Sequence, residues 1–494
     1  MNVRTELRVE ADRFIKGRVG LLLFAITFLC YAFFYQAGGW NQNCRFDLTR
    51  ALVEEQSFKI DLTHENTGDK ARRGEHYYCE KAPLVSFLAV PAHATADLFL
   101  DEEPTDRQLN TAAYVSSVFA VALPAALAVV VFFRLTVFLG LSTRAAAGFS
   151  LAWSLGTMAF PYSTNLYGHQ VCASLLLVSA YLMIRGAAEG EKRSRWRMSA
   201  AGAALGLAFA AEYAGAVGIA CLLLYAVFAV RDKRALLWIA VGAALSLLPL
   251  LLYHWVAFGS PFKLAYHYSI HGVRHAGVFM GIGLPSPRAL FGITFSEYRG
   301  LFVSAPWLLA AVPGFLFLVR RKRTRAIALA SAGVCLSYLW LNASIPDWRA
   351  GWGMGPRFMI AALPFWSLLA AGIWLRLQDL AEPTRKLVTT LLLAAVAVSI
   401  VLMLIASAVG PEVPGTILEP FRAYLIPQFA AGELAVNTQS IDALHPGTGR
   451  AAWNWGQRIG LPGLWSLSPL LLGVLVLAGL VHRALGQNQG RQGS

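Results

Sequence analysis

Apolar runs of about 18 or more residues recur from one end of this 494-residue chain to the other. Hydrophobic residues make up 56% of the sequence and charged residues only 14%, whereas charged residues are roughly a quarter of a soluble domain. A water-soluble fold has no interior for this much apolar surface, and the mean hydropathy is +0.52. The lipid bilayer is the solvent that accounts for the pattern. We therefore predict an all-α, polytopic membrane protein.

The apolar runs predict about twelve membrane helices. In the first half these are residues 20–35, 111–133, 145–160, 170–184, 198–211 and 214–230. In the second half they are 235–258, 306–319, 326–341, 358–375, 387–409 and 464–481. Counting the run at 83–100 as a span would move the basic loop 185–197 to the outside, against the positive-inside rule. We interpret that run as a re-entrant or interfacial helix.

The net charge of +14 comes from short basic loops rather than from one basic domain, which argues against a nucleic-acid partner. Threaded from a cytoplasmic N-terminus, the spans place every such loop in the cytoplasm, as the positive-inside rule requires. The loops are 134–144, 185–197, 231–234, 320–325, 376–386 and the tail after 483. The first apolar run lacks a small-residue cleavage site and indicates an uncleaved signal anchor. We expect a multi-pass protein of a bacterial inner membrane with both termini cytoplasmic.

Four loops then face the extracytoplasmic side: 37–110, 259–305, 342–357 and 410–462. We divide the chain into a transmembrane module, 1–409, and a final part, 410–494, that holds the last outer loop, the last helix and the tail. In the first outer loop, residues 40–61 predict an amphipathic helix lying on the membrane surface. Residues 67–91 then deliver charges and Tyr77 and Tyr78 into the apolar run. These groups are expected at the depth of a lipid phosphate.

Two motifs of this loop are formed by Arg45, Phe46, Arg50, Leu52 and Glu54, and by Gly74, Tyr77, Tyr78, Glu80, Lys81, Pro83 and Leu84. They resemble motifs of the GT-C superfamily, especially its branch of protein O-mannosyltransferases and the lipid A aminoarabinose transferase. Residues 295–306 and 348–364 are similar to segments of bacterial members of the branch, so the resemblance covers about 365 residues. It implies a GT-C-like fold and the transfer of a sugar from a polyprenyl phosphate to a lipid, glycan or protein acceptor.

One feature of the resemblance is missing, because the family's acidic pair would fall near Gln42 and Asn43. The general base is therefore Asp47 or Asp69, and the sequence leaves both open. The alternatives are an exposed charge on the helix for Asp47 and a turn residue after Gly68 for Asp69. The remaining candidates for binding substrate or its phosphate are Arg45, Tyr78, Glu80, Lys81, His169 and Arg357.

Other candidates complete the site. Cys44 and Cys79 both lie in the first outer loop, in an oxidising compartment, so we predict a disulfide that gathers the site. Glu212, at a break between two short spans, is a candidate for function by default. His267, His271, Arg274 and His275 suggest a metal, but no acidic ligand stands at a suitable spacing. We predict no resident cofactor or metal, although a divalent ion is compatible with the pattern.

Three other functions share this pattern. A flippase for a lipid-linked glycan would place charges inside the spans, whereas here they gather in one outer loop. A non-catalytic assembly protein would keep the fold without the acid, and the missing acidic pair leaves this alternative open. An O-antigen ligase or polymerase would concentrate arginines in a large later loop.

Overall fold

The computed structural model describes residues 3–187, 191–271, 282–377, 379–444 and 449–490. Its first helices are α1 (Val3–Ala32), α2 (Trp40–Glu54), α3 (Leu84–Asp97), α4 (Asp106–Ser117), α5 (Leu123–Phe138), α6 (Thr143–Leu155), α7 (Ala159–Tyr162), α8 (Gly168–Ala187), α9 (Glu191–Ala211), α10 (Ala216–Ala229) and α11 (Arg234–Phe258). The later ones are α12 (Pro287–Thr294), α13 (Leu301–Ser304), α14 (Ala311–Arg320), α15 (Arg325–Ser344), α16 (Leu363–Ala371), α17 (Trp374–Leu377), α18 (Glu382–Val409), α19 (Ile426–Ala430), α20 (Trp455–Arg458) and α21 (Ser468–Gly490). The strands are β1 (Phe34–Tyr35), β2 (Lys70–Arg73), β3 (His76–Cys79) and β4 (Trp453–Asn454).

The chain is a mostly helical, multi-pass membrane protein. Seven helical segments of the described residues are long and apolar enough to cross a bilayer: Asp106–Phe138, Gly168–Ala187, Arg234–Phe258, Arg325–Ser344, Arg357–Leu377, Glu382–Val409 and Gly463–Gly486. The predicted count of twelve is not confirmed. Two of the predicted spans are the shorter apolar helices Tyr213–Ala229 and Pro306–Arg320. The predicted span at 145–160 is broken into α6 and α7.

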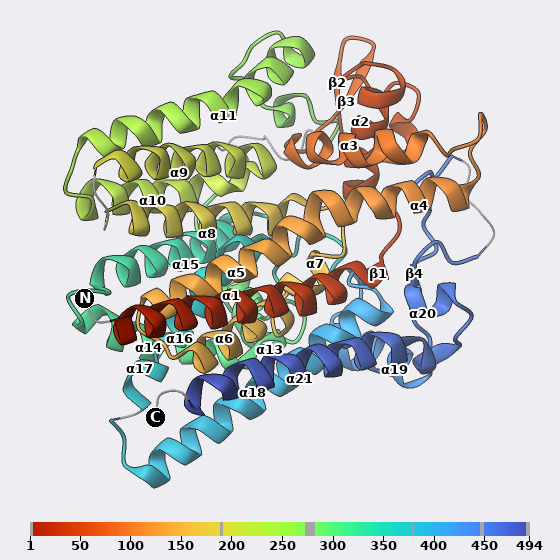
Figure 1. The fold of residues 1–494 in the computed structure, drawn as a ribbon. Coiled ribbons are helices and arrows are strands. Elements are labelled where there is room, and N and C mark those ends of the chain that lie inside the picture. The colour runs from red at the N-terminus through yellow and green to blue at the C-terminus, as the bar shows by residue number, and fades with distance from the viewer. Residues whose placement is uncertain (1–2, 188–190, 272–281, 378, 445–448, 491–494) are drawn as a thin grey trace.

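Helix α3 covers most of the apolar run that we did not count as a span. It has 14 residues, short of the roughly 20 that a membrane crossing needs. It packs against α2 and α4 rather than standing among the long helices (Figure 1).

Small residues let the long helices pack closely. Helices α9 and α11 lie side by side, and a Cβ on Gly202 would come 1.9 Å from the Ile239 carbonyl oxygen. A Cβ on Gly242 would come 1.8 Å from the Ser199 carbonyl oxygen. Without these two glycines the helices must separate, which is how membrane helices commonly use small residues.

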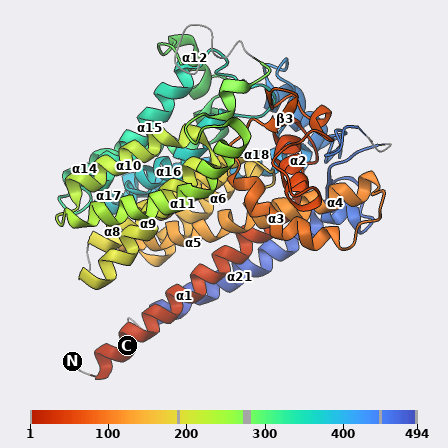
Figure 2. The same ribbon diagram turned by 90° about the horizontal axis from the view of Figure 1, so that it is seen from above.

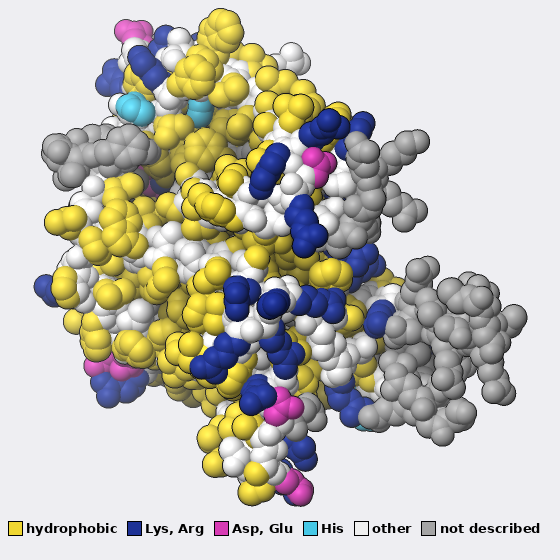
Figure 3. Space-filling view, turned by 90° about the vertical axis from the view of Figure 1, so that its left-hand side faces the viewer, with side chains coloured by type: hydrophobic (Ala, Val, Ile, Leu, Met, Phe, Trp, Pro, Cys, Tyr) yellow, Lys and Arg dark blue, Asp and Glu magenta, His cyan; other side chains and the backbone are white. Residues whose placement is uncertain are grey.

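The chain begins and ends at one end of the molecule. Helices α1 and α21 pack together in opposite directions, so the start of α1 and the end of α21 lie near each other (Figure 2). We call this the basic end and define it by Lys16, Arg134, Arg185 and the residues 320–325. Seen from this side, Lys and Arg side chains gather across the surface among few Asp or Glu (Figure 3).

The other end, which we call the outer end, carries α2, α3 and both strand pairs (Figure 1). Strand β1, directly after α1, pairs antiparallel with β4, so the segment that follows the first helix is joined to the late part of the chain. Strands β2 and β3 form a hairpin in which Lys70 pairs with Cys79. Gly74 occupies the turn with a φ of +64°, a conformation that a side chain disfavours.

Helix α2 differs from the expected surface helix. Ten of its 15 residues are buried, and Gln42, Arg45 and Asp47 are among them. The polar face is covered by protein, because Asn43 donates to the carbonyls of Asn66 and Ser440. The amphipathic pattern therefore marks a helix enclosed by outer loops, with its polar side chains turned into an interior network.

Candidate active site

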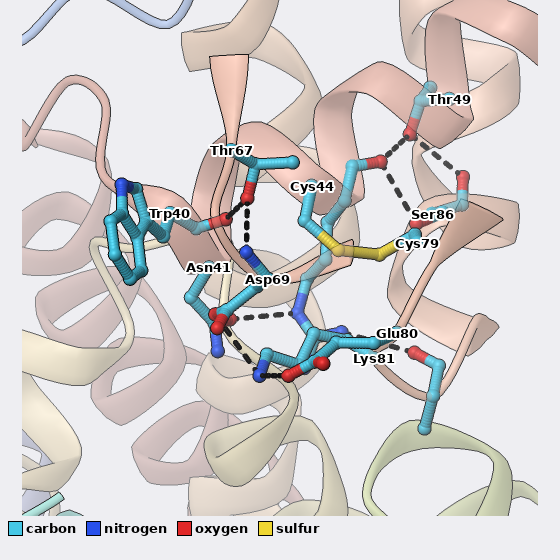
Figure 4. The surroundings of a disulfide bond; sticks show 12 residues. Trp40, Asn41, Cys44, Thr49, Thr67, Asp69, Cys79, Glu80, Lys81 and Ser86 are labelled. Carbon is cyan, nitrogen blue, oxygen red and sulfur yellow. Dashed lines mark hydrogen bonds and ion pairs between the residues drawn. A yellow bond between two sulfur atoms is a disulfide. The ribbon is translucent and has the colours of Figure 1, made fainter. Parts of the chain in front are cut away.

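The β2–β3 hairpin brings Asp69 and Glu80 together. These residues flank the pair of Lys70 and Cys79, and the Glu80 amide donates to the Asp69 carbonyl at 3.2 Å. The structure also joins the two cysteines of the outer loop: the Cys44–Cys79 disulfide, with Cα atoms 5.2 Å apart, ties the hairpin to α2. The strand register and the disulfide bond thus hold three charged residues near one another: Asp69, Glu80 and Lys81 (Figure 4).

Lys81 is held between two carboxylates. Its Nζ lies 3.0 Å from Asp69 Oδ2 and 2.8 Å from Glu80 Oε1. Figure 4 shows the Lys81 ammonium between the two carboxylates. Asp69, Glu80 and Lys81 are 8%, 0% and 7% exposed, and Ser269 Oγ donates to the second Glu80 oxygen at 2.6 Å. Breaking such a buried pair by removing one partner is costly, because the remaining charge stays in the interior.

Arg45 continues the cluster on the far side of the hairpin. Its guanidinium donates to Asn41 Oδ1 at 3.1 Å and to the Ala82 carbonyl at 3.0 Å, and lies 3.8 Å from Glu212 Oε2. His169 Nδ1 is 3.2 Å from the same carboxylate oxygen. Burial lowers the pKa of Arg45, and the negative charges of Glu212 and Asp69 oppose that shift. Two candidates from distant loops, Arg45 and His169, therefore meet at Glu212.

Arg357 lies at the edge of this cluster. Its guanidinium carbon is 5.6 Å from the centre of the Tyr167 ring and 5.8 Å from that of Phe358, within cation–π range. Nη1 donates to the Trp352 carbonyl at 3.2 Å. Its Nε is a buried donor without a hydrogen-bond partner among the described residues, which suits a group that binds an anion.

A second arginine holds the loop that precedes Arg357. Arg299 is 1% exposed and donates to the carbonyls of Arg349 at 3.1 Å, Gly351 at 2.7 Å and Gly353. The glycines of this loop curve around the Arg299 guanidinium, with a φ of +69° at Gly351. Arg299 thus positions the Gly-rich loop, and two sequence motifs some 50 residues apart meet there.

Two residues of the site escaped sequence reasoning: Tyr167 and Glu412. The Tyr167 hydroxyl and Gln42 Nε2 both donate to Glu412 Oε1, the latter at 3.0 Å. Burial raises the pKa of Glu412, and these two hydrogen bonds and the charge of Arg357 oppose the rise. A usable signal existed, since Glu212 and Glu412 are each the first carboxylate after a long helix that ends at the outer end.

Comparisons with known proteins bear on the fold. No protein-family model matches the sequence, and no curated protein sequence matches it. The crystal structure of ArnT from Cupriavidus metallidurans bound to undecaprenyl phosphate matches at a TM-score of 0.54 and 18% identity, over 96% of this chain and 77% of that chain. ArnT is the lipid A aminoarabinose transferase, a GT-C protein. The chain has the GT-C fold.

Two further GT-C structures match at a TM-score of 0.48 each. ArnT of the same organism in the apo state is 16% identical, over 98% of this chain and 76% of that chain. The archaeal oligosaccharyltransferase AglB from Archaeoglobus fulgidus, in complex with an inhibitory peptide and a dolichol-phosphate, is 12% identical, over 91% of this chain and 62% of that chain.

Within this GT-C fold, two candidates lie away from Lys81. Asp47 is fully buried on another side of α2, where Asn66 Nδ2 donates to its Oδ1 at 3.1 Å and its Oδ2 has no hydrogen-bond partner among the described residues. Burial raises the pKa of Asp47 well above its usual range. Tyr78 packs its ring against Phe258, with ring centres 5.4 Å apart, in a small apolar cluster. Of the two candidate bases, the structure brings only Asp69 to Lys81.

The histidine group does not assemble within the described part of the chain. His271 stacks on Trp40 at 5.7 Å, and its Nε2 lies 2.8 Å from the Gly68 carbonyl oxygen. Arg274 and His275 fall outside the described residues. Glu54, His93 and Asp97 place ligand atoms within 4.8 Å of one another, but Glu54 already accepts from Arg50 at 3.1 Å.

Proposed function

We propose that the chain is a glycosyltransferase that moves a sugar from a polyprenyl-phosphate donor to a lipid, glycan or protein acceptor on the extracytoplasmic face. The observation that carries the proposal is the buried pair of Lys81 and Asp69 beside Arg45 and Arg357. Cations to hold a phosphate and a carboxylate to take a proton are the groups that this transfer needs. The ArnT structure with a similar fold holds undecaprenyl phosphate, which supports this class of donor.

In the proposed reaction, Lys81 and Arg357 bind the donor phosphate and stabilise the charge that develops on it. A lone pair of the acceptor attacks the anomeric carbon while the bond from that carbon to the phosphate oxygen breaks, so the configuration inverts. Asp69 takes the acceptor's proton, and polyprenyl phosphate leaves with the bonding electrons. Because Lys81 is paired with Asp69 in the free protein, an incoming phosphate competes for the ammonium and releases the carboxylate for its role as base.

The basic end is proposed to face the cytoplasm, because basic loops stay on that side of bacterial inner membranes. This orientation places both termini in the cytoplasm and the Lys81 cluster outside. No bound metal or cofactor has a role in the proposed step.

The test gives purified protein a set of undecaprenyl phosphate hexoses and pentoses together with a lipid, a glycan or a protein acceptor in turn, and measures release of undecaprenyl phosphate. Asp69→Asn is expected to lower turnover about 100-fold or more, the usual scale for a lost general base. Asp47→Asn is the matched control: a buried aspartate of the same loop that does not contact Lys81, expected to change turnover less than threefold. Full turnover in Asp69→Asn would exclude Asp69 as the base.

The same assay in sealed proteoliposomes addresses the flippase alternative. A flippase moves the intact sugar-bearing lipid between leaflets, and a transferase releases undecaprenyl phosphate. Neither activity in the wild type would favour the non-catalytic assembly protein.

A further inference from the structure

The late outer segment contributes a carboxylate to the same site, and its surroundings indicate what it binds. Glu412 lies three residues after the end of α18, which is far from α2 in the sequence. Gln42 on α2 and Tyr167 before α8 both donate to its Oε1. Three segments thus fix one carboxylate, and the residue remains half-buried rather than sealed from solvent.

The two hydrogen bonds leave the other oxygen available. Glu412 Oε2 has no hydrogen-bond partner among the described residues, and it points toward Gly39. A Cβ on Gly39 would lie 2.6 Å from Oε2, so the absence of a side chain there gives the carboxylate its place. An oriented carboxylate with one available oxygen accepts a hydrogen bond from a ligand hydroxyl.

A second oxygen near Glu412 Oε2, that of the Gln42 amide, also lacks a hydrogen-bond donor. Gln42 is 1% exposed, and while its Nε2 donates to Glu412, its Oε1 is buried without any partner in the described part of the chain. Buried amide oxygens are nearly always paired. Two hydrogen-bond acceptors, Gln42 Oε1 and Glu412 Oε2, therefore lie near each other without a hydrogen-bond donor among the described residues. A polyhydroxylated ligand supplies donors.

The position of Glu412 relative to Arg357 indicates which part of the substrate lies beside Glu412. The Arg357 guanidinium stands 5.6 Å from the centre of the Tyr167 ring, and the hydroxyl of that ring is bonded to Glu412. Glu412 is thus one aromatic ring away from a proposed phosphate ligand. The sugar is the part of the donor attached directly to the phosphate, so its hydroxyl groups fall within that reach.

We propose that Glu412 is a sugar-binding residue of this site: its Oε2, oriented by Tyr167 and Gln42, accepts a hydrogen bond from a hydroxyl group of the transferred sugar. This inference rests on the proposed function, because the sugar must arrive on a lipid phosphate. It assigns a role to the segment that follows α18, and it predicts that Glu412 selects for the sugar and not for the lipid phosphate.

The experiment measures the affinity of the full-length protein for undecaprenyl phosphate and for the best-bound member of the set of undecaprenyl phosphate hexoses and pentoses. Glu412→Gln keeps an acceptor for Tyr167 and Gln42 but lacks the negative charge. It is expected to weaken binding of the sugar-bearing lipid about tenfold, the scale of a hydrogen bond to a charged group, with unchanged binding of undecaprenyl phosphate. Tyr167→Phe removes a hydrogen bond that orients the Glu412 carboxylate, and Gly39→Ala displaces that carboxylate. Both variants are expected to weaken binding of the sugar-bearing lipid and not binding of undecaprenyl phosphate.

Glu419→Gln is the matched control, because Glu419 belongs to the same segment, its side chain is 44% exposed, and it pairs with Arg422 at 2.5 Å. It should leave both affinities unchanged. Unchanged binding of both lipids by Glu412→Gln would overturn the proposal, and so would an equal loss for both, which indicates a structural role. A wild type that binds undecaprenyl phosphate no better with any sugar attached also overturns it. A wild type that binds neither lipid removes the proposed function and this inference with it.

Discussion

The outer end and the basic end of the molecule carry the same residue types in opposite surroundings. At the outer end Lys81 and Arg45 are 7% and 1% exposed, and each lies beside a carboxylate. At the basic end Arg134 and Arg323 are exposed and line a cavity of about 510 Å³. Arg185 and Arg323 place their guanidiniums 5.1 and 5.3 Å from the Phe138 ring.

Under the proposed function, this difference separates charges that orient the protein in the membrane from charges that bind substrate or transfer a proton. Exposed cations keep their hydration, so they cost little and need only lie on the correct side of the bilayer. Buried ions lose hydration, and the pair attraction repays that loss only with good geometry and further hydrogen bonds. The outer cluster meets this condition through a hairpin, a disulfide and bonds from Ser269 and Asn41. Under the proposed function, burial rather than charge count distinguishes the candidate site from the basic end.

The largest expected contrast compares one cation from each end. Lys81→Met should lower turnover about 100-fold or more, because it removes a proposed phosphate ligand and leaves Asp69 and Glu80 without their ammonium. Arg323→Met at the basic end should change turnover less than twofold. Both variants are assayed for release of undecaprenyl phosphate from the sugar-bearing lipid.

Lys81→Arg separates folding from chemistry in that comparison, because it retains the charge between the carboxylates but not the ammonium geometry. It should recover the thermal stability of the wild type more fully than its turnover. Equal losses of turnover in Lys81→Met and Arg323→Met would contradict the distinction between the two ends.

The next largest effect concerns the covalent link at the outer end. Replacing Cys44 and Cys79 together by serine should lower the free energy of unfolding by about 2–4 kcal/mol, since the bond closes a loop of 35 residues. Turnover should fall about tenfold, because the hairpin that carries Lys81 loses its tie to α2. Thermal unfolding and turnover are measured on the double variant, with Cys172→Ser, a free buried cysteine, as control. The unfolded wild type alkylated without reductant should show four modified thiols by intact mass, those of the free cysteines, and modification of all six would contradict this prediction.

A smaller effect on turnover, but a distinct pH signature, is expected at Asp47. Burial raises its pKa well above the ordinary value of 3.8, so rising pH ionises the unfolded chain first and lowers the free energy of unfolding. Asp47→Asn removes this pH-dependent loss of stability, and the new side chain can still accept the hydrogen bond from Asn66. Its unfolding midpoint should exceed that of the wild type at pH 7, and the gap should narrow as the pH falls toward 4. A gap that does not change with pH would show that Asp47 ionises normally in the folded protein.

Much of the fold could be predicted from the sequence, because the bilayer allows few ways to bury an apolar run. The predicted span 235–258 nearly coincides with α11, which ends where Gly259 adopts a φ of +70°. Predictions failed where neighbouring protein, not lipid, decides the structure. The span at 145–160 breaks into two helices, and the polar face of α2 is covered by segments far away in the sequence.

The candidate site shows the same division. Asp69, Lys81 and the cysteine pair lie within one loop, so local motifs and compartment chemistry could point to them. Glu412 meets Gln42 across 370 residues, and Arg299 meets the Gly351 carbonyl across 52. No local pattern contains such contacts. The choice between Asp47 and Asp69 depended on which side of α2 faces the hairpin, and the sequence alone does not give that orientation.

The smallest expected effect on catalysis is at the basic end. The same variant tests whether the charges of that end bind anionic lipids. Replacing Arg134 and Arg323 together by glutamine should leave turnover and the unfolding midpoint almost unchanged, because both side chains are exposed. It should weaken retention of anionic phospholipids by the purified protein, by about 1 kcal/mol per charge removed. Native mass spectrometry with phosphatidylglycerol and, as the neutral control, phosphatidylcholine measures that retention. A fall in turnover comparable with that of Lys81→Met would mean that exposed cations, too, support the reaction, and burial would no longer separate the two ends.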